Sequence, residues 1–183
     1  MSTEPTFKHR LEFLGLGFVF LLGRTLPRRW FVRLGAALGR FVHDVLGTRK
    51  EVTRDNLRRA LPNHGEAEID RLVRATYDQL GGSLLEFASL PGMSKQQLVE
   101  VVRFENLETL DRVRASGRGA MLVTAHFGSW ELFGASFVAR GYPTTFFVKR
   151  QKNPLVADLQ DDIRRQAGIE IVTEGPGVAK GVL

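Results

Sequence analysis

The chain has 183 residues, of which 43% are apolar and 25% are charged, as in one ordinary globular domain. This composition excludes disorder of the whole chain, and the absence of cysteine excludes a disulfide framework, a thiolate metal site and a cysteine nucleophile. A net charge of +6 and a pI near 10.2 predict anionic partners, for which nucleic acid and anionic lipid both qualify.

The most apolar stretch of the chain, Phe13 to Gly23, lies among the basic residues of the N-terminal region. It is shorter than the run of about 20 residues that a membrane-spanning helix needs. Positive charge beside apolar sequence is typical of a segment at a lipid surface. We therefore expect residues 1–46 to form a membrane-associating helical segment and residues 47–183 to belong to a second region. The alternative is that the apolar stretch is a buried hairpin helix of a soluble core.

The rest of the first ninety residues has the spacing of helices, with apolar residues at steps of three and four. The expected helices are Trp30 to Leu46, Lys50 to Ala60, Glu66 to Leu80, and a short one after Gly81 and Gly82. Gly47 is a suitable end for the first of these, and Pro62 stops the second.

Strands and helices are expected to alternate after Pro91. The predicted strands are Val99–Phe104, Ala120–Ala125, Thr144–Lys149 and Ile169–Val172, and the predicted helices are Asn106–Ser116, Ser129–Arg140 and Asn153–Ala167. Alternation of this kind predicts an α/β fold, in which a largely parallel sheet with crossover helices follows the helical N-terminal region. The continuous apolar run Ala120–Ala125 predicts a strand that is buried on both faces.

The segment Ala125 to Leu132, AHFGSWEL, carries the residues best suited to catalysis. His126 follows a predicted strand, Gly128 permits a sharp turn, and Ser129 can cap the next helix. Glu131 falls in the first turn of that helix, where the helix dipole favours a carboxylate. Because a carboxylate can orient an imidazole as a general base, His126 and Glu131 are predicted to be a catalytic pair. The alternative is a structural histidine beside a helix-capping glutamate.

Segments spread over most of the chain share a pattern with one family of enzymes. They are GRGAMLVTAHFGSWE with its His-x4-acid element, RDNLRRALPN from Arg54, the spacing of Tyr77, Gly81 and Glu86, RFENLETL from Arg103, and FFVKRQKNPLVADLQDDIRRQAG from Phe146. In these segments the chain resembles the bacterial lipid A biosynthesis acyltransferases (lauroyl and myristoyl transferases), which are similar to actinobacterial phosphatidylinositol mannoside acyltransferases.

The resemblance implies transfer of a fatty acyl group from an acyl carrier protein or coenzyme A thioester to a hydroxyl of a glycolipid such as a lipid A precursor. It implies His126 as general base and Glu131 as its partner. It also places Arg164 near the reacting groups, where a guanidinium could hold a phosphate or an oxyanion. The alternative for Arg164 is a solvated charge on a helix face. The implied location is the cytoplasmic face of the inner membrane, with anionic lipids as further partners.

Arg150 and Asn153 resemble the substrate-binding part of the family pattern, but Lys149 and Gln151 replace its tyrosine and its first proline. The alternative for Asn153 is a helix cap ahead of a proline at the first helical position. The family continues well past the last residue of this chain. We therefore expect residues 47–183 to be the N-terminal part of the acyltransferase α/β domain, with a glycerolipid-acyltransferase-like fold that is incomplete at the C-terminus.

No metal or other cofactor is predicted, because His9, His43, His64 and His126 lack the spacing of metal ligands. The glycine-rich segment Glu174 to Gly181 lacks the ending of a phosphate-binding loop and is predicted to be a turn. Two other functions stay open. One is a basic non-enzymatic protein that binds nucleic acid or membranes, and the other is a nucleotide-binding enzyme that uses Gly175 and Gly177. The clustering of arginines near the apolar stretch argues against nucleic acid.

Overall fold

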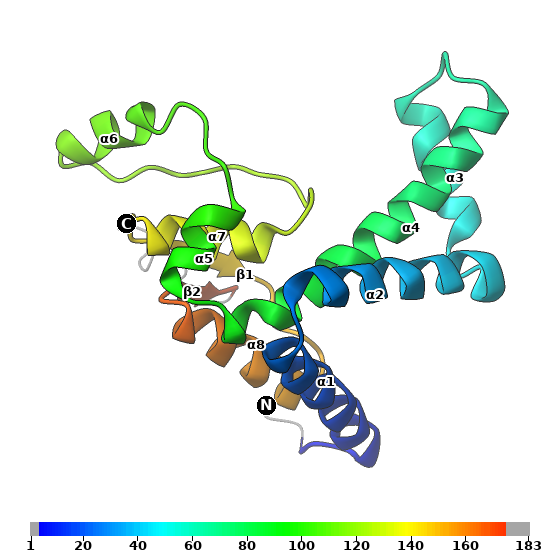
Figure 1. Cartoon of the computed structure of the whole chain (residues 1–183), viewed down its shortest axis with the longest axis horizontal. Helices are drawn as coiled ribbons and strands as arrows, with labels where there is room; N and C mark the ends of the chain where they lie inside the picture. The colour runs from blue at the N-terminus through cyan, green and yellow to red at the C-terminus, as the bar shows by residue number, and fades with distance from the viewer. Residues whose placement is uncertain (1–3, 175–183) are drawn as a thin grey trace.

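The computed structural model describes residues 4–174, which are mostly helical with one small parallel sheet. The helices are α1 (Phe7–Thr25), α2 (Arg28–Phe41), α3 (Lys50–Ala60), α4 (Glu66–Ser89), α5 (Lys95–Val101), α6 (Glu108–Ala115), α7 (Trp130–Ala139) and α8 (Pro154–Gln166), and the strands are β1 (Thr145–Val148) and β2 (Glu170–Thr173). In Figure 1, α2 and α4 run side by side away from the sheet, and α3 lies at their far end.

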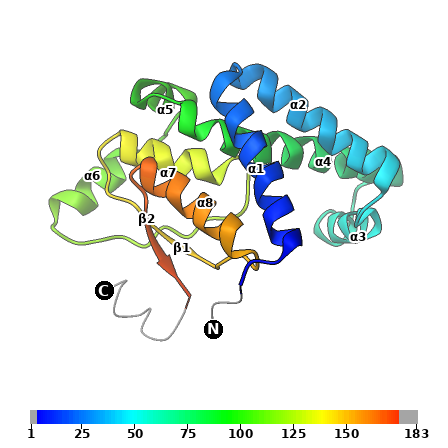
Figure 2. The same ribbon diagram turned by 90° about the horizontal axis from the view of Figure 1, so that it is seen from below.

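Helix α1 contains the whole apolar stretch Phe13 to Gly23 and extends it at both ends. It begins at a capping box, in which the Thr6 hydroxyl accepts from the His9 amide and the His9 ring accepts from the Thr6 amide. Among residues 4–174, no helix combines the length and the apolar character needed to cross a bilayer. One face of α1 packs against α4 and α8, as Figure 2 shows for α8, and the opposite face is exposed.

The helix predicted for Trp30 to Leu46 is confirmed, with an irregular end. Helix α2 continues into a π-helical turn, Val42–Leu46, which stops at Gly47 with a φ of 60°. A left-handed residue at this point is the ordinary way to end a helix, and glycine adopts it without steric cost. Helix α3 has the predicted bounds, Lys50–Ala60.

The prediction of two helices separated at Gly81 and Gly82 is wrong, because α4 is a single helix of 24 residues that runs through both glycines. Glycine lowers helix stability by about 1 kcal/mol per residue relative to alanine. Here the two glycines let α2 approach closely, since an added Cβ on Gly35 of α2 would lie 2.3 Å from the Gly81 carbonyl oxygen. Close packing against α2 offsets the low helix propensity and explains why the helix is not interrupted.

The strand predicted for Val99–Phe104 is wrong, because α5 occupies Lys95–Val101. The helix starts at a capping box formed by Ser94 and Gln97. The carbonyl groups at the C-terminal end of α5 accept hydrogen bonds from side chains. The Ser136 hydroxyl of α7 donates to the Leu98 carbonyl at 2.8 Å, and Arg140, which directly follows α7, donates to the Val99 and Val102 carbonyls. These carbonyl groups therefore have hydrogen-bond partners without pairing to a neighbouring strand.

The buried strand predicted for Ala120–Ala125 is also wrong, because the segment has no regular secondary structure and is exposed. Met121 and Val123 are 79% and 91% exposed. A strand forms only where a neighbouring strand satisfies its backbone groups, and within the described part of the chain no strand pairs with this segment. Helix α6, which precedes it, agrees with the helix predicted for Asn106–Ser116.

The sheet consists of β1 and β2, which pair in parallel with Thr145 opposite Glu170 and Val148 opposite Thr173. Helix α8 connects the two strands, as expected of a crossover helix. The predicted strands Thr144–Lys149 and Ile169–Val172 are therefore confirmed to within a residue or two. The α/β class holds in a coarser form than predicted, with a small sheet beside many helices. Most of the segment Glu174 to Gly181, including Gly175 and Gly177, lies outside the described residues.

One hydrophobic core joins the N-terminal helices to the sheet end of the molecule. Its buried members include Phe20, Phe31, Phe87, Leu98, Ala135 and Ile163. They come from α1, α2, α4, α5, α7 and α8, so the two N-terminal helices share this core with the rest of the described chain. A second cluster of Ile69, Val73 and Tyr77 holds α3 against α4.

Candidate active site

The AHFGSWEL segment forms the turn before α7 and the first turn of that helix. Gly128 has a φ of 61°, which turns the chain sharply into the helix. Ser129 occupies the N-cap position, as predicted, but its hydroxyl makes no capping hydrogen bond. That oxygen is buried and without a hydrogen-bond partner in the described structure. Trp130 and Glu131 follow as the first two residues of the helix.

The Glu131 carboxylate is buried, with 4% of the residue exposed, and Arg164 of α8 holds both of its oxygens. The guanidinium donates to Oε1 at 2.6 Å and to Oε2 at 3.1 Å. This two-pronged geometry is the strongest arrangement of an arginine and a carboxylate. The structure therefore brings together two of the five predicted site residues, which lie 33 positions apart in the sequence.

A second carboxylate shares the same guanidinium, because Arg164 also donates to Asp161 at 3.2 Å. The side chains of Arg164 and Asp161 are only 13% and 8% exposed, and the guanidinium lies 5.9 Å from the centre of the Phe87 ring. Burial acts to lower the pKa of Arg164, but the hydrogen bonds and charges of Glu131 and Asp161 outweigh it, so that the pKa lies above its ordinary value. Arg164 is therefore an enclosed, permanently charged group and not a solvated charge on a helix face.

His126 lies in the exposed turn before α7, with its ring packed edge-on against Trp130 at 4.7 Å between centroids. No hydrogen bond joins His126 to Glu131 in the part of the chain that the structure describes. The imidazole is thus open to a reactant, while the carboxylate predicted to orient it is held by Arg164.

Asn153 and Arg150 make other contacts. The Asn153 side-chain oxygen accepts from the Leu155 amide at 3.1 Å and caps α8, in agreement with the alternative given for this residue. Its amide nitrogen donates at 2.9 Å to Glu12 and, at the same distance, to a backbone carbonyl of α1. Asn153 is buried and ties α8 to α1. Arg150 is exposed and pairs with Asp158 of α8 at 2.6 Å.

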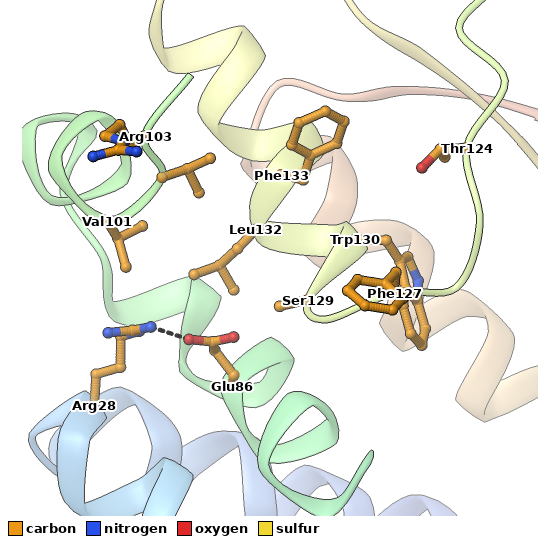
Figure 3. A pocket seen from close by; sticks show the side chains of 11 residues that line it. Arg28, Glu86, Val101, Arg103, Thr124, Phe127, Ser129, Trp130, Leu132 and Phe133 are labelled. Carbon is orange, nitrogen blue, oxygen red and sulfur yellow. Dashed lines mark hydrogen bonds and ion pairs between the residues drawn. The ribbon is translucent and has the colours of Figure 1, made fainter. Parts of the chain in front are cut away.

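An open cavity of about 490 Å³ lies beside the first turn of α7 (Figure 3). Its walls are largely apolar and include Val101, Phe127, Trp130, Leu132 and Phe133. Arg28 of α2 and Glu86 of α4 form an ion pair at its edge. The cavity thus adjoins the turn that carries His126, and a volume of this size is within the ordinary range for small-molecule sites.

Reasoning from the sequence missed Asp161 and Arg28 as members of this region. Asp161 precedes Arg164 by three positions on a helix, a spacing that permits an ion pair, but the spacing alone does not show that the pair is buried. Arg28 stands among several N-terminal arginines, and only the packing of α2 on α4 distinguishes it by bringing it to Glu86.

A model of the family described as bacterial lipid A biosynthesis acyltransferase matches residues 3–180. The chain belongs to this family. It is 28% identical over 127 residues to a lipid A biosynthesis palmitoleoyltransferase of Escherichia coli K12, covering 69% of this chain and 41% of that protein. It is 27% identical over 153 residues to the lipid A biosynthesis lauroyltransferase of the same strain, covering 84% and 49%.

A relative that is named for a different substrate also matches. The chain is 30% identical over 124 residues to a phosphatidylinositol mannoside acyltransferase of Mycobacterium tuberculosis CDC 1551, covering 67% of this chain and 39% of that protein. The matched region spans less than half the length of each of these relatives. The family resemblance seen in the sequence is thereby confirmed.

Proposed function

We propose that the intact protein transfers a fatty acyl group from an acyl thioester, carried by acyl carrier protein or coenzyme A, to a hydroxyl of a glycolipid such as a lipid A precursor. The observation that supports this most is the buried Glu131, held by Arg164 in the first turn of α7, directly after a turn that presents an exposed imidazole and adjoins a largely apolar cavity. Membership of the family supports the same reaction class.

In the proposed reaction His126 is the general base. The imidazole removes the proton of the acceptor hydroxyl, and the oxygen then forms a bond to the acyl carbonyl carbon. The carbon–sulfur bond breaks, and the imidazolium returns the proton to the departing thiolate. The exposure of the ring leaves its nitrogen lone pair accessible to the acceptor hydroxyl.

Glu131 is the proposed partner of His126 through the lone pairs that Arg164 leaves unused. A carboxylate has about four acceptor positions, and Arg164 uses two of those on Glu131. In the proposed reactive arrangement the His126 ring donates to one of the others. Arg164 is proposed to keep Glu131 charged and fixed in orientation. Arg150, whose guanidinium is exposed, is retained as a candidate contact to the substrate, and Asn153 as a structural support for it.

We also propose that residues 1–46 hold the protein on the cytoplasmic face of the inner membrane. Helix α1 exposes an apolar stripe of Phe7, Leu11, Leu14, Phe18 and Leu21, and α2 exposes one of Trp30, Leu34, Leu38 and Phe41. Each stripe repeats at steps of three and four and therefore follows one helix face. On α2 the exposed Arg29, Arg33 and Arg40 flank the stripe, which suits the headgroups of anionic lipids.

The substitution His126→Ala in the intact protein tests the reaction. We expect acyl transfer to fall by about 100-fold or more, since general-base catalysis contributes about 10²–10⁴ in rate. Product formation from a radiolabelled acyl thioester and a glycolipid acceptor gives the measurement. His64→Ala, at an exposed turn residue remote from α7, is the matched control and should keep normal turnover. Near-normal turnover of His126→Ala would refute the assignment.

A further inference from the structure

The cavity beside α7 has the make-up of a site for an amphiphile. It lies where the N-terminus of α2, the C-terminal part of α4, the end of α5 and the first turn of α7 meet. Figure 3 shows Arg28 and Glu86 on one side, Phe127 and Trp130 on another, and Leu132 with Ser129 between them. The apolar walls suit a hydrocarbon chain, and the polar groups gather at its edge.

The charge at this edge favours an anion. Two guanidinium groups, those of Arg28 and Arg103, line the cavity against the single carboxylate of Glu86. The Arg28 side chain is 42% exposed, and its guanidinium has five N–H donors, of which one is used by Glu86. Arg103 is 88% exposed and pairs with Glu105, which is itself accessible, so its charge can turn toward a ligand. The remaining donors are therefore available to an anionic group.

Ser129 provides an independent sign of a missing partner. It lines the cavity, its hydroxyl is buried, and that hydroxyl neither caps α7 nor bonds to any other group in residues 4–174. Buried polar atoms without a partner are uncommon, because they lose their bonds to water and gain none in return. The first-turn amides of α7, a helix of ten residues, lie next to this hydroxyl and favour negative charge.

We propose that this cavity binds the phosphate end of an amphiphilic substrate, with Arg28 as its polar contact, the Ser129 hydroxyl as a second contact once it rotates about the Cα–Cβ bond toward the cavity, and the apolar wall around Trp130 and Leu132 holding the hydrocarbon chain. The site deepens the proposed function, on which the identity of the amphiphile rests. Both substrates of that reaction can carry a phosphate ester and an acyl chain in one molecule: the glycolipid acceptor carries both on its sugar, and the thioester donor carries the phosphate at one end of its pantetheine arm and the acyl chain at the other. The shared chemistry is an amphiphile with a phosphate ester on its polar part and a hydrocarbon chain.

A fluorescence titration of the 183-residue chain tests the site. The chain has two tryptophans, and the substitution Trp30→Phe leaves Trp130, which lines the cavity, as the single reporter. The probes are dodecyl phosphate below its micelle concentration, dodecanol, and inorganic phosphate. We expect saturable binding of dodecyl phosphate, with dodecanol and inorganic phosphate at least about tenfold weaker. Equal binding of dodecanol and dodecyl phosphate would overturn the proposal.

Variants of the polar contacts give the second arm. Arg28→Gln should raise the Kd of dodecyl phosphate at least about tenfold, and Ser129→Ala should raise it several-fold. The double variant Arg28→Gln/Glu86→Gln removes both charges of the ion pair and should show the same loss without leaving an unpaired carboxylate. The matched control is Arg59→Gln, since Arg59 is exposed on α3 and does not line the cavity. An unchanged Kd in the double variant would also overturn the proposal.

Competition identifies the source of the phosphate. An acyl phosphopantetheine and a monomeric phosphorylated glycolipid are each tested for displacement of dodecyl phosphate, and the stronger competitor identifies the natural ligand. Displacement by neither would overturn the assignment to this reaction. These outcomes are separate from those of His126→Ala, because binding at the cavity requires no turnover. If the cavity does not bind dodecyl phosphate but His126→Ala abolishes turnover, only the proposed binding site is refuted. If the cavity binds dodecyl phosphate but His126→Ala keeps near-normal turnover, only the proposed reaction is refuted.

Discussion

At the scale of single residues, the central feature is one arginine shared by two buried carboxylates. Arg164 bonds to both oxygens of Glu131 and to Asp161, and all three side chains are at most 13% exposed. Taking charges out of water is costly, and the arrangement is stable only because each charged group has partners. Asp161 binds the guanidinium of Arg164, and Arg164 in turn binds Glu131. The orientation of the candidate catalytic carboxylate on α7 therefore depends on two residues of α8.

The substitution Arg164→Met should destabilise the fold by about 3–5 kcal/mol, because it leaves two buried carboxylates without a partner. The free energy of unfolding, measured by urea titration, gives this value. Arg165→Met is the matched control, since Arg165 pairs with Asp162 on the exposed side of the same helix, where the side chains are 59% and 63% exposed. We expect it to cost about 1 kcal/mol or less. An equal decrease in the free energy of unfolding in the two variants would show that the buried ion cluster contributes no more to stability than the exposed pair.

At the scale of elements, the contact of α2 with α4 depends on small residues. An added Cβ on Gly39 would lie 2.0 Å from the Tyr77 carbonyl oxygen, and one on Gly81 would lie 2.2 Å from the Gly35 carbonyl oxygen. Both obstacles are backbone atoms, which cannot turn aside as a flexible side chain can. The two helices must therefore separate if either glycine is replaced by a larger residue, and Arg28 would then move relative to Glu86.

Gly39→Ala should lower stability by about 1–3 kcal/mol through overpacking, despite the higher helix propensity of alanine. Thermal unfolding followed by circular dichroism measures the change. Gly15→Ala in α1 is the control, because a Cβ at Gly15 has no atom within 4 Å. We expect this control to be neutral or up to about 1 kcal/mol more stable. A stabilised Gly39→Ala variant would contradict the close approach of the helices.

At the scale of the whole molecule, α1 has two roles that divide between its faces. Its inner face contributes Phe20 to the common core and receives the Asn153 side chain, which caps α8, and its outer face carries the exposed apolar stripe. A membrane surface that binds the stripe would therefore lie against a helix that shares its core with the candidate site. Removing the helix would disturb the core, so point substitutions on the outer face give the cleaner test.

The double substitution Leu14→Glu/Phe18→Glu should weaken binding to vesicles of phosphatidylglycerol and phosphatidylethanolamine by about 100-fold or more, since burying each apolar side chain contributes about 1.5–3 kcal/mol. Co-sedimentation gives the affinity. Val52→Glu, at a 56% exposed residue of α3, is the control and should bind normally. Unchanged sedimentation of the double variant would place the membrane contact elsewhere.

The sequence by itself determined the features that depend on neighbouring residues. The bounds of α3, the glycine that ends the π-helical turn, and the cap and proline that begin α8 all follow from local propensities and spacing. The resemblance to the family also follows from short segments read in order. These inferences hold because caps, turns and helix periodicity act over a few residues.

Only the tertiary structure decided which predicted residues meet. Glu131 and Arg164 are 33 positions apart and Asn153 and Glu12 are 141 apart, so no local pattern could show that each pair shares a hydrogen bond. The same reason explains the two wrong strands: an apolar run becomes a strand only beside another strand, and the Val99 carbonyl instead accepts a hydrogen bond from Arg140 at the end of α7. Pairing across the chain, and the burial that gives it strength, are properties of the folded molecule.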